Sequence, residues 1–230
     1  APLGRAYARI LERLGALGVE WVQLDEPILA TELAPRWLAA FETVYAALAG
    51  RGPRILLTTY FGGVTHHARA IARLPVDGIH LDLVRDPGQL APWLELLPPA
   101  GVPSAGVSDG RNVWRADLRA ELDRLRPVHE AIGERLWIAP SCSLLHVPVS
   151  VAGDEGVDPE LRGWLAFADE KLGELGTLAR ALGEGEASVR SELEAADAAL
   201  ASRRASGRTV DAAVRARVAG VRAAMTERRS

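Results

Sequence analysis

WVQLDEP, at residues 21–27, is a short apolar run rich in β-branched and aromatic residues that ends in two acids and a proline. This pattern predicts a buried strand followed by its exit loop. A helix is predicted directly before it, because residues 5–17 carry apolar side chains at helical spacing and Gly18 follows as a C-cap. The apolar positions of that helical face are Tyr7, Ile10, Leu11, Leu14 and Leu17.

The same alternation of helix and strand continues along the chain. Further strands are predicted at residues 54–61, 78–84, 102–108 and 136–142. Helices are predicted around residues 35–49, 63–73, 87–97, 116–132 and 159–182. Strands that alternate with helices in this way pair in parallel through right-handed crossovers, since a parallel connection must be long enough to return. The sequence therefore predicts an α/β fold with a parallel sheet.

Polar or reactive side chains end every predicted strand, which distinguishes a barrel from an open doubly wound sheet. A barrel gathers the carboxyl ends of its strands around one mouth. The strand ends carry Asp25 and Glu26, then Thr58, Thr59 and Tyr60, then Asp82, then Ser108 and Asp109, and last Ser141, Cys142 and Ser143. The sequence contains no glycine-rich phosphate loop of the GxGxxG or GxxxxGK[ST] type. We therefore predict a partial (β/α)8 TIM-type barrel, with about five of the eight parallel strands that the complete fold has.

The domain organisation changes near residue 158. Residues 1–158 carry the predicted strands and form the later part of a barrel, whereas residues 159–230 are predicted to be a helical extension and linker. The last part of the extension is rich in Ala, Glu and Arg, and its arginines indicate a solvated helix face rather than a basic arm. The chain starts with Ala1 and a helix, and its only methionine is Met225. We therefore expect a segment of a barrel, whose exposed strand edges favour instability or self-association in isolation.

The charge and cysteine content limit the partners and the compartment of the chain. The formal net charge is -3 at pH 7, and attraction to nucleic acid or an anionic membrane needs a surplus of Lys and Arg. Cys142 is the single cysteine and cannot form an internal disulfide. No apolar run approaches the ~18–20 residues that span a bilayer. We expect a cytoplasmic protein that binds neither nucleic acid nor membrane.

Three residues are candidates for substrate binding. Asp25 and Glu26 are adjacent carboxylates at a strand end, where they could act as an acid and base pair or merely fix the loop. Arg115 lies in GRNVWRADL, residues 110–118, and could clamp a carboxylate. The alternative for this segment is structural, with Asp117 capping the next helix and Trp114 packing on the barrel rim.

Residue types that bind zinc also occur, but their spacing does not form a recognised site. Cys142, His80, Asp82 and His146 belong to these types, yet the sequence contains no CxxC or HExxH motif. A structural cysteine is the favoured interpretation of Cys142. His80 is expected to be a hydrogen-bonded core histidine, because it lies in the middle of a predicted strand. His66 and His67, at a helix start, are expected to be exposed.

The motifs together resemble one family. WVQLDEP, LLTTYF, GIHLDLV, SDGRNVWRADL and LWIAPSCSLLH are similar, in order and spacing, to the N-terminal half of cobalamin-independent methionine synthase. The resemblance implies a segment of a methyltransferase that moves a methyl group from 5-methyltetrahydropteroyltriglutamate to homocysteine. It also implies that the strands are the last five of an N-terminal barrel, which packs against a catalytic barrel beyond this chain.

In that family, the resemblance implies, zinc is held in the C-terminal half by a His-x-Cys pair, a Glu and a Cys. Thr58 and Tyr60 stand where the His-x-Cys pair would be, as lost ligand positions, and Asp82 stands where the Glu would be. Cys142 alone matches a ligand, so Cys142 and Asp82 are vestigial positions. We therefore expect this segment to bind no cofactor and to be inactive alone.

Two other functions remain open at this point. The chain could be a stand-alone barrel remnant that binds a small anionic ligand or a partner protein through Asp25, Glu26, Arg115 and Asp117. It could also be a complete metal-dependent barrel enzyme, which would require zinc at Cys142 and Asp82.

Overall fold

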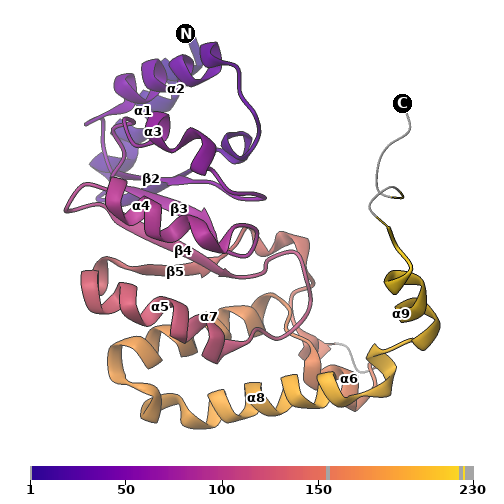
Figure 1. Cartoon of the computed structure of the whole chain (residues 1–230). Coiled ribbons are helices and arrows are strands. Elements are labelled where there is room, and N and C mark those ends of the chain that lie inside the picture. The colour runs from indigo at the N-terminus through magenta and orange to yellow at the C-terminus, as the bar shows by residue number, and fades with distance from the viewer. Residues whose placement is uncertain (1, 154–155, 223–224, 226–230) are drawn as a thin grey trace.

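A computed structural model of the chain describes residues 2–153, 156–222 and 225. Five parallel strands form a single sheet in sequence order, and the sheet curls into a half-barrel (Figure 1). The strands are β1 (Trp21–Asp25), β2 (Arg54–Thr58), β3 (Gly78–Asp82), β4 (Val102–Ser108) and β5 (Trp137–Pro140). The predicted α/β fold with a partial parallel barrel is confirmed, although most strands end a few residues before the predicted boundaries.

Helices connect the strands and continue after the last one. They are α1 (Pro2–Ala16), α2 (Pro35–Leu48), α3 (Ala68–Ile71), α4 (Leu90–Leu96), α5 (Leu118–Ile132), α6 (Pro159–Trp164), α7 (Ala168–Glu184), α8 (Arg190–Ala205) and α9 (Ala212–Ala219). In Figure 1, α7 lies beside α5 near β5, α8 lies outside both, and α9 stands apart from the sheet. In the described part of the chain, no helix is both long and apolar enough to span a bilayer.

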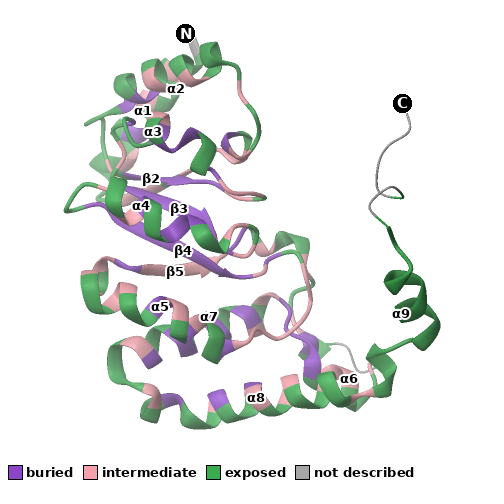
Figure 2. Cartoon of the chain, in the orientation of Figure 1, coloured by how far each residue is buried: buried purple, intermediate pink, exposed green. Residues whose placement is uncertain are grey.

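The two faces of the sheet differ in chemistry because successive side chains on a strand point to opposite sides. The face toward the helices is apolar, and its buried side chains include Ile55, Leu57, Ile79, Leu81 and Ala105. Figure 2 shows this burial concentrated on the central strands and the inner sides of the helices, while α9 is exposed. The opposite, concave face carries polar side chains. The helices therefore pack on one side only, and the other side is left to form a site.

The sheet curls far enough to bring its two edges together. Trp21 in β1 and Trp137 in β5 lie at opposite edges of the sheet, yet their ring centroids are 4.7 Å apart in an edge-to-face arrangement. The Arg54 guanidinium lies 4.4 Å from the centroid of the Trp21 ring. Aromatic pairs of this geometry stabilise a contact beyond the area that they bury. The rings close the concave face at the amino ends of the edge strands.

The apolar face predicted for the first helix is only partly buried. Leu11 is buried, but Tyr7, Ile10 and Leu17 remain exposed, so the prediction of a fully packed face is wrong. The helix instead approaches the loop before β2 along a narrow strip. A Cβ atom at Gly52 would lie 2.2 Å from the Leu11 carbonyl oxygen, so this approach requires glycine.

Two of the predicted helices are shorter than their sequence patterns indicate. Each begins with a 3-10 turn, at Thr65–His67 before α3 and at Pro87–Gln89 before α4. The two connections are tied to each other, because the Val64 backbone N–H donates to Gln89 Oε1 at 3.1 Å. This tertiary bond fixes the backbone in a way that helical periodicity does not encode.

The predicted continuous helix at residues 159–182 is also wrong. It is broken between α6 and α7, where Leu165 forms a β-bridge with Trp114 and Ala166 N–H donates to the Val113 carbonyl at 2.8 Å. The helices on both sides of residue 158 belong to one core, since Leu175, Leu178 and others in α7 and α8 pack in the same apolar cluster as the sheet. The division at residue 158 stays a prediction.

Leu57→Ala tests the packing of the sheet against the helices. Leu57 is 0% exposed at the centre of the core, so truncation should lower the free energy of unfolding by about 2–5 kcal/mol. Leu145→Ala is the matched control, because Leu145 is 93% exposed and its truncation should cost less than about 0.5 kcal/mol. Urea unfolding of both variants measures the difference. Equal losses would contradict the assigned core.

Candidate functional site

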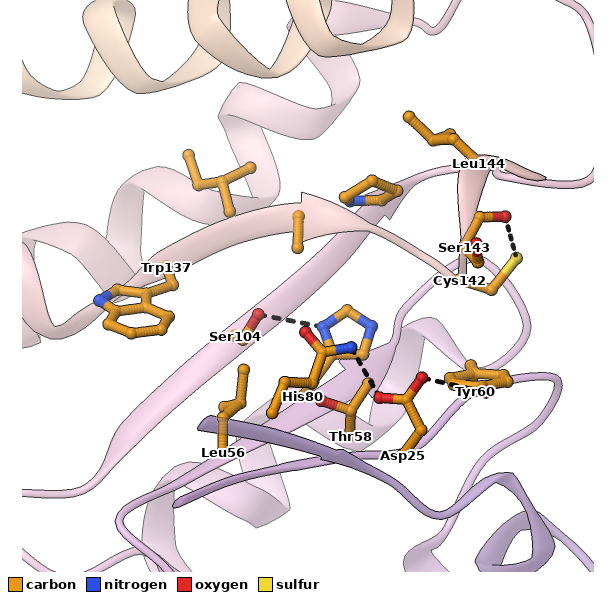
Figure 3. Close-up of a pocket in the computed structure, with 14 residues that line it drawn as sticks. Asp25, Leu56, Thr58, Tyr60, His80, Ser104, Trp137, Cys142, Ser143 and Leu144 are labelled. Atoms are coloured by element: carbon orange, nitrogen blue, oxygen red, sulfur yellow. Dashed lines mark hydrogen bonds between the residues drawn. The ribbon is translucent and has the colours of Figure 1, made fainter. Parts of the chain in front are cut away.

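A row of side chains crosses the concave face of the sheet from β1 to β5. The strand register places Asp25 opposite Thr58, Thr58 opposite His80, His80 opposite Ser104, and Ser104 opposite Trp137. All five residues line a cavity of about 590 Å³ (Figure 3). The row combines a carboxylate, two hydroxyls, an imidazole and an indole on one rigid surface. It is the densest group of polar side chains on the concave face.

Asp25 holds one end of the row through two neutral donors. The Gln23 side-chain amide donates to Asp25 Oδ1 at 2.7 Å, and the Tyr60 hydroxyl donates to Asp25 Oδ2 at 3.3 Å. Burial and the Asp25 charge raise the pKa of Tyr60, so its phenol stays protonated and able to donate. Neither donor carries a positive charge. Asp25 therefore brings an uncompensated negative charge to the cavity.

His80 lies in the middle of the row as a buried, hydrogen-bonded side chain, as the sequence predicts. Its Nδ1 lies 3.0 Å from Ser104 Oγ and its Nε2 lies 3.4 Å from the Ser141 carbonyl. A carbonyl oxygen can only accept, so we assign the proton to Nε2 and the role of acceptor to Nδ1. Burial lowers the pKa of His80, which favours the neutral ring. A Cβ at Gly106 would lie 2.8 Å from the imidazole, so glycine makes room for it.

Thr58 occupies the place between Asp25 and His80. The residue is 5% exposed, and none of the described residues offers its Oγ1 atom a hydrogen-bond partner. Buried hydroxyls nearly always have a partner in folded proteins, because an unpaired one costs free energy. Thr58 is thus a polar group on the cavity wall with unused hydrogen-bonding capacity.

Asp82 organises the loops at the carboxyl end of the sheet. Its Oδ2 accepts from the Phe61 backbone N–H at 3.0 Å, and its Oδ1 accepts from Val84 and Arg85 at 3.1 and 3.0 Å. The residue is 1% exposed. Phe61 has a φ of 72°, a left-handed conformation that a bulky residue seldom adopts. The bond from Asp82 holds this strained turn in place.

Cys142 is a buried thiol, as the structural interpretation predicts. It is 5% exposed, and its Sγ lies 3.7 Å from the Ser143 carbonyl oxygen. Burial raises the pKa of the thiol, and the negative charges of Asp82 and Asp109 raise it further. The thiolate is the form that attacks electrophiles or binds metal. Cys142 is therefore suited to packing and unsuited to either task at neutral pH.

The four positions compared with the zinc ligands of the resembling family do not fit zinc. Thr58 and Tyr60 present hydroxyls, and both Asp82 oxygens already accept backbone N–H bonds. Cys142 remains the one soft ligand, whereas structural zinc sites use four. Among the described residues, no three His, Cys, Asp or Glu side chains gather closely enough to hold a metal ion. This arrangement does not favour a complete metal-dependent enzyme.

Glu26 follows Asp25 but has different partners. The Tyr45 hydroxyl donates to Glu26 Oε1 at 3.1 Å. Glu26 lines a second cavity of about 820 Å³ between α1, α2 and β1, and it does not line the cavity of the row. Burial raises the pKa of Glu26, and the Tyr45 bond opposes this shift. Whether Asp25 and Glu26 bind substrate stays a prediction.

Arg115 lies away from the row and contacts α6. Its Nε donates to the Gly163 carbonyl at 2.9 Å, and its backbone N–H donates to the Trp164 carbonyl at 3.0 Å. Arg115 is absent from the described lining of the cavity that Asp25 shares with Thr58. The structure thus separates Arg115 from the predicted carboxylate pair, and its role in substrate binding stays a prediction.

The rest of the GRNVWRADL segment has the structural role that the sequence allowed. Asp117 caps α5 by accepting from the Ala120 N–H at 3.2 Å. Lys171, the only lysine of the chain, is 1% exposed and donates to the Trp114 carbonyl at 3.1 Å. The Arg203 guanidinium from α8 lies 3.9 Å from the Trp114 ring centroid. These contacts fix the segment between the sheet and the later helices.

The histidines near α3 correct one expectation. His66 is exposed, as expected, but His67 is buried and its Nε2 lies 3.0 Å from the Thr31 carbonyl. His67 begins a helix that packs on the loop after β1, which the sequence pattern did not reveal. The sequence also did not reveal Ser104 or Gln23 as members of the site. Their only sequence signal is a polar residue at an alternate position of a strand.

Asp82→Asn tests the role of the carboxylate in loop organisation. The amide keeps the shape but removes the charge that strengthens the backbone bonds, so the free energy of unfolding should fall by about 2 kcal/mol. Glu95→Gln makes the same chemical change at an exposed position of α4 and should change stability by less than about 0.5 kcal/mol. Chemical denaturation compares the two. An unchanged Asp82→Asn variant would show that the loops do not depend on this residue.

Alkylation of the single cysteine tests the state of Cys142. The raised thiol pKa and the burial predict that iodoacetamide reacts with the folded chain at least about tenfold more slowly than with N-acetylcysteine at pH 7. The rate should rise with pH beyond the range in which the free thiol levels off, and urea should remove the protection. Mass spectrometry follows one site without ambiguity. A folded chain that reacts as fast as the free thiol would contradict this account.

The chain matches the family model described as "Cobalamin-independent synthase, N-terminal domain" over residues 2–133. Two proteins named 5-methyltetrahydropteroyltriglutamate–homocysteine methyltransferase are close relatives. The one from Paraburkholderia xenovorans is 52% identical over 224 residues, covering 97% of this chain and 29% of its own length. The one from Ralstonia pickettii is 53% identical over 224 residues, covering 96% of this chain and 28% of its own length. The chain thus spans less than a third of these relatives.

A solved structure supports the fold. The putative vitamin-B12 independent methionine synthase from Listeria monocytogenes matches 79% of this chain and 53% of its own chain, with a TM-score of 0.56 and 15% sequence identity. At this identity the similarity concerns the fold alone. The match of the family model covers more than half of the sequence, including β1 to β4 and most of α5. The chain therefore belongs to the cobalamin-independent synthase family and corresponds to part of its N-terminal domain.

Proposed function

We propose that the chain is part of an enzyme that transfers a methyl group from 5-methyltetrahydropteroyltriglutamate to homocysteine in methionine biosynthesis. The observation that carries this proposal is the identity of 52% over 97% of the chain with a methyltransferase of that name. The similarity covers both the barrel strands and the following helices, so it is not confined to one motif. The cytoplasm is the compartment we propose for the protein, which has a single cysteine and no internal disulfide.

Within that enzyme, this segment serves as a scaffold and carries no step of the reaction. Its one thiol is held protonated by burial, its central histidine is buried and neutral, and Asp82 is engaged with backbone N–H groups. Zinc, which activates the homocysteine thiol in the family, belongs to a catalytic barrel outside this chain. The residues of this segment instead set the shape of the barrel mouth that packs against that partner.

The helices after residue 158 form the proposed connection toward the catalytic barrel. The first of them are anchored on this domain, because α7 and α8 share its apolar core. Arg119 in α5 also bonds to Asp197 in α8 at 2.6 Å, and Arg204 in α8 bonds to Asp117 at 3.1 Å. The arginines of α8 are thus used within the domain. The exposed helix α9 is the part that could continue toward another domain.

The alternative of a stand-alone remnant that binds a small anion has less support. Of the described residues that line the cavity of the row, none is Lys or Arg, and an anion is normally held by such side chains or by a helix amino end. Arg115, the predicted clamp, donates to α6 instead. The methyltransferase segment is therefore the function that we propose.

A chimera tests the proposed function. In the Paraburkholderia xenovorans relative, the 224 matching residues are replaced by the corresponding residues of this chain. We expect the chimera to keep a kcat/KM for methionine formation within about tenfold of the parent, because a scaffold of the same family preserves the mouth of the barrel.

Two controls define the outcome. A parent protein with the same segment deleted should lose activity, and the isolated chain supplied with zinc and both substrates should form no methionine. Circular dichroism and zinc analysis verify that the chimera is folded and loaded. A folded, zinc-loaded chimera without activity, or methionine formation by the isolated chain, would refute the proposal.

A further inference from the structure

The cavity of the row is negative on one side and has no positive side chain in its described lining. Asp25 is the only charged group there, since the remaining described residues are neutral polar or apolar and burial keeps His80 neutral. The donors to Asp25 are the neutral side chains of Gln23 and Tyr60. No ion pair among the described residues involves Asp25. The cavity therefore attracts positive charge and repels anions.

Hydrogen-bond acceptors adjoin this charge. Thr58 lies directly opposite Asp25 in the parallel register and directs an unpartnered, buried Oγ1 atom into the same cavity. Ser104 gives its proton to His80, so its remaining lone pairs are acceptors. Figure 3 shows Asp25 and Thr58 next to each other beneath the His80 ring. A donor group with several N–H bonds would satisfy the carboxylate and the hydroxyl together.

The opposite wall of the cavity is apolar. Leu56, Trp137, Ile138 and Pro140 line it, and the contact of Trp137 with Trp21 closes the amino end of the concave face. A bare inorganic cation would leave this wall unused and would find a single carboxylate. The combination of one carboxylate, free hydroxyl acceptors and an apolar wall suits a ligand with a charged nitrogen head and a compact hydrophobic body.

We propose that this cavity is a binding site for a small organic cation, of the primary ammonium or amidinium class, attached to an apolar or aromatic body. The nitrogen donates to Asp25 and Thr58, and the body packs on Leu56 and Trp137. The charge-assisted bond to Asp25 compensates for the lost hydration of the cation. This site is separate from the methyl-transfer reaction and does not depend on the function proposed above.

Isothermal titration of the 230-residue chain with three ligands of similar shape tests the proposal. The probes are benzylammonium, benzyl alcohol and benzoate, at low salt and neutral pH. We expect saturable binding of one benzylammonium per chain, at least about tenfold tighter than that of benzyl alcohol, and no binding of benzoate. The NMR signal of the Trp137 indole N–H should shift with the same saturation curve.

Variants assign the binding to the row. Asp25→Asn should weaken benzylammonium at least about tenfold and leave benzyl alcohol unchanged, and Thr58→Val should weaken the cation severalfold. Glu95→Gln removes a carboxylate outside the cavity and should have no effect. If Asp25→Asn does not fold, Thr58→Val and Tyr60→Phe carry the test.

Three outcomes would overturn the proposal. They are no saturable binding of benzylammonium at millimolar concentrations, equal binding of benzylammonium and benzoate, and cation binding that the Asp25 and Thr58 variants leave unchanged. None of these results depends on methionine formation. Failure here is therefore distinguishable from failure of the chimera.

Discussion

The contact between Trp21 and Trp137 joins the two edge strands of the sheet and defines its curvature. These strands are not hydrogen-bonded to each other, so the rings meet only because the five parallel strands between and including them bend into a half-barrel. The bend gives the sheet two unlike faces. The convex face packs against helices with aliphatic side chains, and the concave face surrounds a polar cavity. Parallel pairing further brings all carboxyl ends to one mouth.

The mouth shows how a site of reactive residue types can serve structure. Asp82 uses its carboxylate to hold three backbone N–H groups, including that of the strained Phe61. Cys142 is buried, and its pKa is raised by desolvation and by neighbouring acids. These features agree with membership in a family whose proteins are more than three times as long as this chain. We attribute the chemistry of the reaction to the part of such proteins outside this segment.

Much of the fold follows from local sequence patterns, because apolar runs that end in polar residues mark parallel strands well. The boundaries of α3, α4 and α6 do not, since tertiary bonds such as that from Val64 to Gln89 fix them. The exposed face of α1 is a similar case: helical spacing identifies an amphipathic helix but not its partner. The site was less predictable. Asp25 was recognised from its position at a strand end, whereas its relation to Thr58 and Ser104 depends on strand register, which no local pattern encodes.

The most direct test of this account is a nuclear Overhauser measurement on the 230-residue chain, with the indole signals assigned by Trp21→Phe and Trp137→Phe variants. The curled sheet predicts cross-peaks between the ring protons of Trp21 and Trp137, whose centroids are 4.7 Å apart. Indole rings that show cross-peaks only to neighbours within their own half of the sheet would mean an open sheet. That result would contradict the enclosed cavity and the row of side chains that lines it.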